Sequence, residues 1–281
     1  MKNVFINPVL NKEFKLRFRS FRTFLGLLSY LIAMGIVVIG YMFLETSMGG
    51  SSQFIRPDQS RIMFMVLAYL QLGLILFITP GLTSGVISGE RERQTLNILL
   101  TTAQSSTSII ISKLTSSISY LLLLLAASLP FYSLVFLFGG VSPVTIVKVM
   151  GFYLFTIFVF GSFGILFSTL IRRTIVSMIS TYGITLFLSG GAAFLFMISI
   201  SYYEFANVKP PLVLPYILAA FNPPIVFSGL FEEGINQAFK DTTGISFPLI
   251  WSYLIIYTLL ALLALWVSIK KLRPNMIPKK G

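Results

Sequence analysis

Long apolar stretches alternate along this chain with short polar segments, and the polar segments hold all 21 basic and all nine acidic residues. A helix needs about 20 mostly apolar residues to cross the hydrocarbon core of a bilayer. A charge at the bilayer centre costs about 2.5–3.5 kcal/mol on insertion scales, so charge-free stretches of this length favour membrane spans. The pattern predicts an all-α membrane protein with six transmembrane helices, over residues 24–44, 62–88, 114–138, 149–171, 174–203 and 247–269.

Composition supports the same class and narrows the chemistry. Hydrophobic residues make up 56% of the 281 positions and charged residues 11%, against about 25% charged in soluble domains. We therefore expect one transmembrane domain over residues 1–281. The chain has no Cys and no His, which removes thiolate nucleophiles, imidazole bases and the usual zinc ligands.

The spans also lack the charged groups that membrane enzymes and proton-coupled carriers use. We expect the chain not to be an enzyme and to have no catalytic, cofactor-binding or metal-binding residue. Hydroxyl groups such as those of Thr79, Ser84 and Ser162 keep sodium binding open.

The net charge of +12 is explained by topology rather than by nucleic-acid binding. If the N-terminus is cytoplasmic, six crossings return the C-terminus to the cytoplasm. The inner segments then hold 16 of the 21 basic residues, as the positive-inside rule predicts. The five outer basic residues are Arg56, Arg61, Lys148, Lys209 and Lys240.

Residues 1–23 have the pattern of an amphipathic elbow helix that precedes the first span. Phe14, Phe18 and Phe21 recur on one face and basic residues project from the other. Such a helix lies in the headgroup layer with its basic face toward anionic membrane lipid. A plain stop-transfer charge cluster is the alternative interpretation.

Small residues mark the end of the second span. Pro80 predicts a kink, because proline removes a backbone hydrogen bond. Gly81, Gly85 and Gly89 then repeat at four-residue spacing, which lets two helix backbones approach closely. The contact could be a subunit interface or a hinge, or ordinary packing within the chain.

The segment 89–113 combines a charge cluster with a short amphipathic pattern. Apolar residues recur at helical spacing after the cluster, which predicts a short helix lying flat below the membrane. Alternating charges offer paired contacts to a partner, whereas a solvated charge run is the alternative. The residues concerned are Glu90, Arg91, Glu92 and Arg93, followed by Leu96, Leu99 and Leu100.

Two further segments have distinctive patterns. In the outer segment 204–246, prolines interrupt the apolar runs 213–221 and 225–230. These runs are too short to span and predict short re-entrant helices before the last span.

The string Leu-Ser-Gly-Gly at 188–191 resembles the signature sequence of ATP-binding cassettes. The chain has no phosphate-cradling G-x-x-x-x-G-K-[ST] loop, so we do not expect it to hydrolyse ATP.

Three motifs resemble those of the type 2 ABC transporter permeases, the exporter-like superfamily. The first is Asn7-Pro8-Val9-Leu10-x-Lys12-Glu13-Phe14, similar to the elbow helix of that family. The second runs from Gly89-Glu90-Arg91-Glu92-Arg93-Gln94-Thr95-Leu96 to Leu99-Leu100-Thr101-Thr102 and Lys113, and resembles its coupling-helix region. The third is Phe221-Asn222-Pro223-Pro224 before the last span.

The resemblance implies a bacterial cell-membrane exporter subunit that works with a separate ABC ATPase subunit, which would hold ATP and magnesium. A second permease chain, identical or paralogous, would complete the transporter. Glu90 and Glu92 would meet basic residues of the ATPase, Arg91 and Arg93 its acids, and the three leucines an apolar groove. The substrate would be a peptide, an antibiotic or a lipid-like molecule. A non-transporting scaffold or sensor and a sodium or small-ion permeation protein remain open alternatives.

Overall fold

The computed structural model describes residues 21–48, 57–96, 105–207, 210–231 and 233–272, which form helices and no strand. Six helical segments among these residues are long and apolar enough to cross a membrane, in agreement with the six predicted spans. The elbow residues Phe14 and Phe18 and the leucines Leu99 and Leu100 lie outside the described residues. The spans are Thr23–Glu45, Asp58–Glu92, Ser106–Leu137, Pro143–Leu170, Thr174–Phe205 and Leu249–Leu272.

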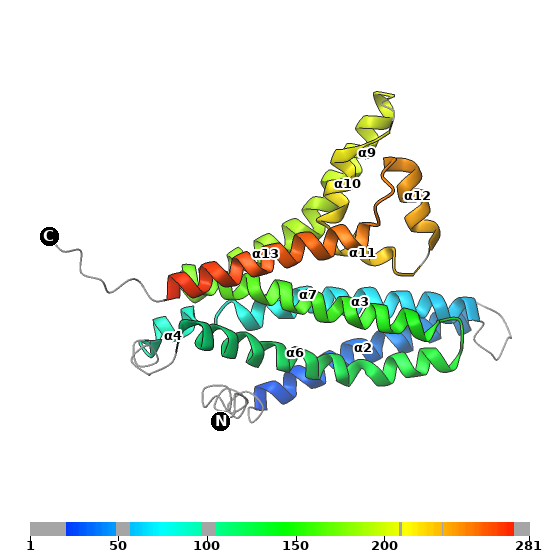
Figure 1. Cartoon of the computed structure of the whole chain (residues 1–281). Helices are drawn as coiled ribbons and strands as arrows, with labels where there is room; N and C mark the ends of the chain where they lie inside the picture. The colour runs from blue at the N-terminus through cyan, green and yellow to red at the C-terminus, as the bar shows by residue number, and fades with distance from the viewer. Residues whose placement is uncertain (1–20, 49–56, 97–104, 208–209, 232, 273–281) are drawn as a thin grey trace, which may run out of the picture.

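The helices of the spans run back and forth through one bundle (Figure 1). The short helix α4 (Ser88–Glu92) lies at the end of the bundle where α2 begins and α13 ends, here called the α4 end. The long helices are α2 (Phe21–Met48), α3 (Pro57–Thr83), α6 (Ser106–Leu137), α7 (Pro143–Leu170) and α13 (Leu249–Leu272). The fifth span consists of α8 (Thr174–Leu186), the π-helix η1 (Phe187–Gly191) and α9 (Ala192–Phe205).

Three short helices connect the fifth span to the last. They are α10 (Val213–Ala220), α11 (Pro223–Ser228) and α12 (Glu233–Thr243). Helix α10 packs along α9, and α12 lies near the beginning of α13, at the end of the bundle opposite α4 (Figure 1). The short helices expected in segment 204–246 are therefore present, while their depth in a bilayer stays a prediction.

The connections from α6 to α7 and from α7 to α8 are short. Gly139 and Gly140 have φ values of +80° and +86° between α6 and α7, a region that glycine enters without steric cost. Ser142 then caps α7, because its Oγ accepts from Val144 N at 3.3 Å. Only residues 171–173 separate α7 from α8, so these two helices form a tight hairpin.

Helix α7 is the centre of the bundle and packs against α3, α6, α8 and α13. In its apolar part 67% of the residues are buried, against 17% in α2 and 22% in the fifth span. Aromatic rings fill the space between α7 and α13, where Phe152 and Tyr253 stack with their ring centroids 5.1 Å apart. Lipid tails are as apolar as the side chains, so such packing contacts contribute much of the association of membrane helices.

A glycine that the sequence patterns did not single out, Gly164, allows α3 and α7 to approach closely, whereas Gly161 has room on the α3 side. A Cβ atom added at Gly164 would lie 1.8 Å from Thr83 Oγ1 and 3.2 Å from Ser84 N. One added at Gly161 would lie 3.8 Å from Thr83 Cγ2. The close backbone approach therefore depends on the absence of a side chain at Gly164.

We predict that Gly164→Ala destabilises the protein, because the new methyl group would overlap Thr83 and press on backbone. Overpacking typically costs about 1–3 kcal/mol, and we expect the upper part of that range or misfolding. The matched control is Gly73→Ala on α3, where no atom lies within 4 Å of an added Cβ. Thermal unfolding of both purified variants in detergent tests this, and equal melting temperatures would contradict the assigned contact.

Candidate functional site

The second span is interrupted at residues 84–87, between α3 and α4. Pro80 itself lies inside α3, so the interruption comes one turn later than the position where the sequence predicted a kink. Ser168 of α7 satisfies the backbone there, since its Oγ accepts from Ile87 N at 2.8 Å and from Ser88 N at 3.0 Å. A serine of another helix thus replaces the missing backbone acceptors.

The carbonyl group before the interruption is satisfied in the same way. Ser84 O accepts from Ser177 Oγ of α8 at 2.7 Å and from Ser88 Oγ at 3.2 Å. Of the three hydroxyls considered for sodium, Ser162 Oγ donates to Phe158 O at 2.8 Å. The hydroxyls of Thr79 and Ser84 are buried without a hydrogen-bond partner.

The glycine repeat of the second span lies against α8 of the same chain. A Cβ added at Gly81 would lie 2.8 Å from Tyr182 Oη, and one at Gly85 3.1 Å from Thr174 Cγ2. At Gly89 the nearest atom would be Thr174 Oγ1, at 3.7 Å. In the described structure the repeat therefore serves packing within the chain, where it brings α3 and α4 close to α8.

The charge cluster of α4 begins with an ion pair. Glu90 Oε1 accepts from Lys113 Nζ of α6. Lys113 is only 3% exposed, and the Glu90 side chain is 26% exposed with its Oε2 atom buried and unpartnered. Since a buried ammonium group without a counter-ion is costly, the ion pair with Glu90 offsets the burial of Lys113 inside the bundle.

The next two charges connect α4 to α7 and α8. Arg91 Nη2 donates to Thr169 O at 3.1 Å. Glu92 accepts from Thr174 N at 2.8 Å and from Thr174 Oγ1 at 2.7 Å, so its carboxylate caps the beginning of α8. A negative charge at this position also interacts favourably with the helix dipole.

The remaining predicted site residues divide between surface and core. Arg93 is exposed, and Phe21, at the beginning of α2, is 76% exposed. Leu96 is buried in an apolar cluster formed with residues of α6, α7 and α13. In this conformation Leu96 supports the chain's own packing. Docking of Leu99 and Leu100 stays a prediction.

Together these contacts define a polar cluster, here called the α4 junction. It joins the second span to α6, α7 and α8 through Lys113, Ser168, Thr169, Thr174 and Ser177. The sequence indicated the charges but not their partners within the chain. Single serine and threonine residues have no recognisable spacing, so only the fold shows that they contact α4 and the interrupted backbone beside it.

A second irregularity lies in the fifth span, where the Leu-Ser-Gly-Gly string coincides with η1. The buried side chain of Asn222 contacts it, because Nδ2 donates to Leu188 O at 3.1 Å and to Ser189 O at 2.5 Å. Asn222 Oδ1 accepts from Ile225 N at 2.9 Å and caps α11. One asparagine therefore connects the segment before the last span to the π-helix.

Comparisons with known proteins give no identification. No protein-family model matches the chain, and no curated protein sequence matches it. Within the described residues, no group of three or more His, Cys, Asp or Glu could hold a metal ion. The assignment of function therefore depends on the geometry of the α4 junction and on the motifs of the sequence.

We predict that Glu90→Gln lowers the free energy of unfolding by about 2 kcal/mol, because Lys113 stays buried without its counter-ion. Breaking a fully buried pair costs about 3–5 kcal/mol, and the partial exposure of Glu90 reduces this loss. The double variant Glu90→Gln/Lys113→Met should recover part of the stability. Chemical unfolding in detergent measures both, with Lys271→Met at an exposed position as control. A double variant less stable than Glu90→Gln would argue against the pair.

We predict that Asn222→Asp is at least as destabilising as Asn222→Ala. At an ordinary helix cap Asp replaces Asn well, but here a carboxylate would face two backbone carbonyls instead of donating to them. Asn222→Ala should lose about 2 kcal/mol, from the cap and the buried hydrogen bonds. Asn222→Asp keeps the cap but should lose at least as much, because its carboxylate faces the two carbonyls. Full tolerance of Asp, measured by thermal unfolding, would mean that only the cap of α11 contributes.

Proposed function

We propose that the chain is the permease subunit of an ATP-driven exporter, with ATP hydrolysed on a separate ABC ATPase subunit. The observation that carries the proposal is the α4 junction. The segment that resembles the coupling region of type 2 ABC permeases forms direct polar contacts with three other transmembrane helices. A docking segment that transmits force needs such contacts.

The junction offers a physical route for coupling. A displacement of α4 would act on α6 through Glu90 and Lys113, on α7 through Arg91, and on α8 through Glu92. These are short contacts to packed helices, and rigid elements joined in this way move together rather than independently. Closure of a docked ATPase would then reorient several spans at once.

The peripheral spans suit the lipid and the second permease chain that the proposal requires. Helix α2 and the fifth span are the least buried, at 17% and 22% of their apolar parts. Large side chains such as Ile175, Leu186 and Phe194 project from the fifth span and are 65–71% exposed. We propose that these faces contact bilayer lipid and a second permease chain, with a central pathway between the two copies. By the resemblance, the cargo is a peptide, an antibiotic or a lipid-like molecule.

The proposal assigns the two ends of the bundle to opposite sides of the membrane. The α4 end would be cytoplasmic, in agreement with the positive-inside distribution of charges. Both termini would then be cytoplasmic. Segment 204–246, with α10, α11 and α12, would lie on the outer side.

We predict that Arg93→Glu and Leu99→Asp each abolish co-purification of an ABC ATPase subunit with this chain. Arg93 is exposed, so its reversal tests docking without disturbing the buried pair. Glu90→Ala is a poorer test, because it also leaves Lys113 uncompensated. The measurement is affinity purification from the native membrane in mild detergent, followed by mass spectrometry.

The control for this experiment is Lys271→Gln, an exposed cation at the same end of the bundle on α13. It should retain the ATPase, and the wild-type preparation should also show whether a second permease is present. A chain that purifies without any ATPase in several mild detergents would contradict the proposal. That result would favour the scaffold or ion-permeation alternatives.

A further inference from the structure

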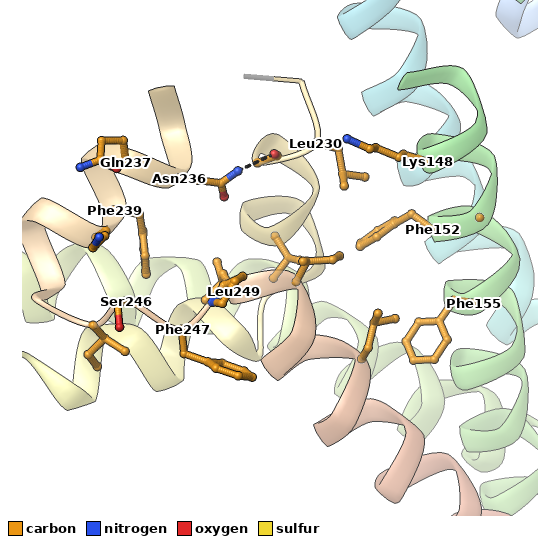
Figure 2. A pocket seen from close by; sticks show the side chains of 18 residues that line it. Lys148, Phe152, Phe155, Leu230, Asn236, Gln237, Phe239, Ser246, Phe247 and Leu249 are labelled. Atoms are coloured by element: carbon orange, nitrogen blue, oxygen red, sulfur yellow. Dashed lines mark hydrogen bonds between the residues drawn. The ribbon is translucent and has the colours of Figure 1, made fainter. Parts of the chain in front are cut away.

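A pocket of about 780 Å³ opens between α7, α11, α12 and the beginning of α13 (Figure 2). It lies at the end of the bundle opposite the α4 junction and shares no residue with it. Its volume falls within the range of about 300–1,000 Å³ that is typical of small-molecule sites. The pocket is therefore large enough for a ligand of lipid or drug size.

The walls of the pocket are mainly aromatic and aliphatic. Phe152 and Phe155 face it from α7, Phe239 from α12, Leu249 from the beginning of α13, and Phe247 from the segment just before that helix (Figure 2). Polar groups are fewer. The amide of Asn236 donates to Gly229 O at 2.9 Å and that of Gln237 to Asp241 Oδ1 at 3.1 Å, while Ser246 adds a hydroxyl.

Two lysines on separate elements give the pocket a positive charge. Lys148 comes from α7 and Lys240 from α12, both are exposed, and the described residues that line the pocket include no carboxylate. Only five of the 21 basic residues fall in the segments assigned to the outer side, and two of these five line this pocket. The positive-inside bias predicts few cations here, so it does not account for the pair.

Charge and apolar surface are arranged in order along α7. Gly151, Phe152 and Phe155 follow Lys148 by three, four and seven residues, so all four residues share one helix face. Lys148 lies near the beginning of α7, and Phe155 lies about 10 Å further along the helix axis, toward the α4 end. The pocket thus presents a cation at one end and aromatic rings beyond it.

We propose that this pocket binds an amphiphile with an anionic head group and an acyl chain. The head group contacts Lys148 and Lys240, and the chain lies against Phe152 and Phe155. A free fatty acid and an anionic phospholipid share this chemistry. The site is independent of the proposed function, because binding requires neither the ATPase nor a second permease chain.

Gly151 provides a direct way to close the pocket. It lines the cavity, and no atom lies within 4 Å of a Cβ added there. Gly151→Trp would therefore place an indole in the cavity without overlap at the backbone. Replacing a helical glycine also favours the helix, so loss of folding is not expected to obscure the result.

The test uses the full chain in phosphatidylcholine nanodiscs with a dansyl-labelled undecanoic acid as fluorescent probe. Competition by oleate and by dioleoyl phosphatidylglycerol separates the two sources of the ligand, and oleamide provides the uncharged comparison. Lys148→Gln/Lys240→Gln should weaken probe binding about tenfold, through loss of two charge-assisted contacts. Gly151→Trp should abolish it.

Two controls match these variants. Lys270→Gln/Lys271→Gln makes the same change in net charge at the other end of the bundle and should leave binding unchanged. Lys148→Arg/Lys240→Arg keeps both charges and should retain it. Displacement by oleate or by the phosphatidylglycerol, but not by oleamide, supports the proposal and identifies the source. Equal displacement by oleamide, or binding unaffected by both the lysine pair and Gly151→Trp, would overturn it.

Discussion

A bilayer leaves no water to satisfy a backbone group that lacks its partner, and two spans of this protein depart from regular α-helix. The second span is interrupted after Thr83 and the fifth contains η1. In both, a side chain from another element contacts the irregular backbone: Ser168 beside the first and Asn222 beside the second. The geometry of the bundle depends on these contacts, because each irregularity is matched to a particular neighbour.

The same contacts organise the molecule around α7. This helix holds α3 through the close approach at Gly164 and holds the interrupted backbone through Ser168. Next to Ser168, Thr169 accepts from Arg91 of α4. Close packing and the polar junction thus meet at the same end of one helix. A displacement of α4 would therefore act on the most buried helix of the bundle as well as on α8 of the more exposed fifth span.

The spans followed from the sequence because the avoidance of charge over about 20 residues is a physical requirement of the bilayer. The roles of Glu90, Asn222 and Gly164 did not. Each depends on one partner far away in the sequence, Lys113, Leu188 or Thr83, and a single sequence has no periodicity that pairs them. Leu-Ser-Gly-Gly gave no indication of a π-helix.

The capping of α8 by Glu92 has an evolutionary consequence. Helices usually take their cap from the residue that precedes them, but α8 takes it from a residue 82 positions earlier. A shorter side chain at position 92 would leave the first amide of α8 without this acceptor. A local cap arising at Arg173 would in turn release Glu92 from that requirement. Positions 92 and 173 are therefore expected to change together among descendants of this gene, although the two residues are far apart in the sequence.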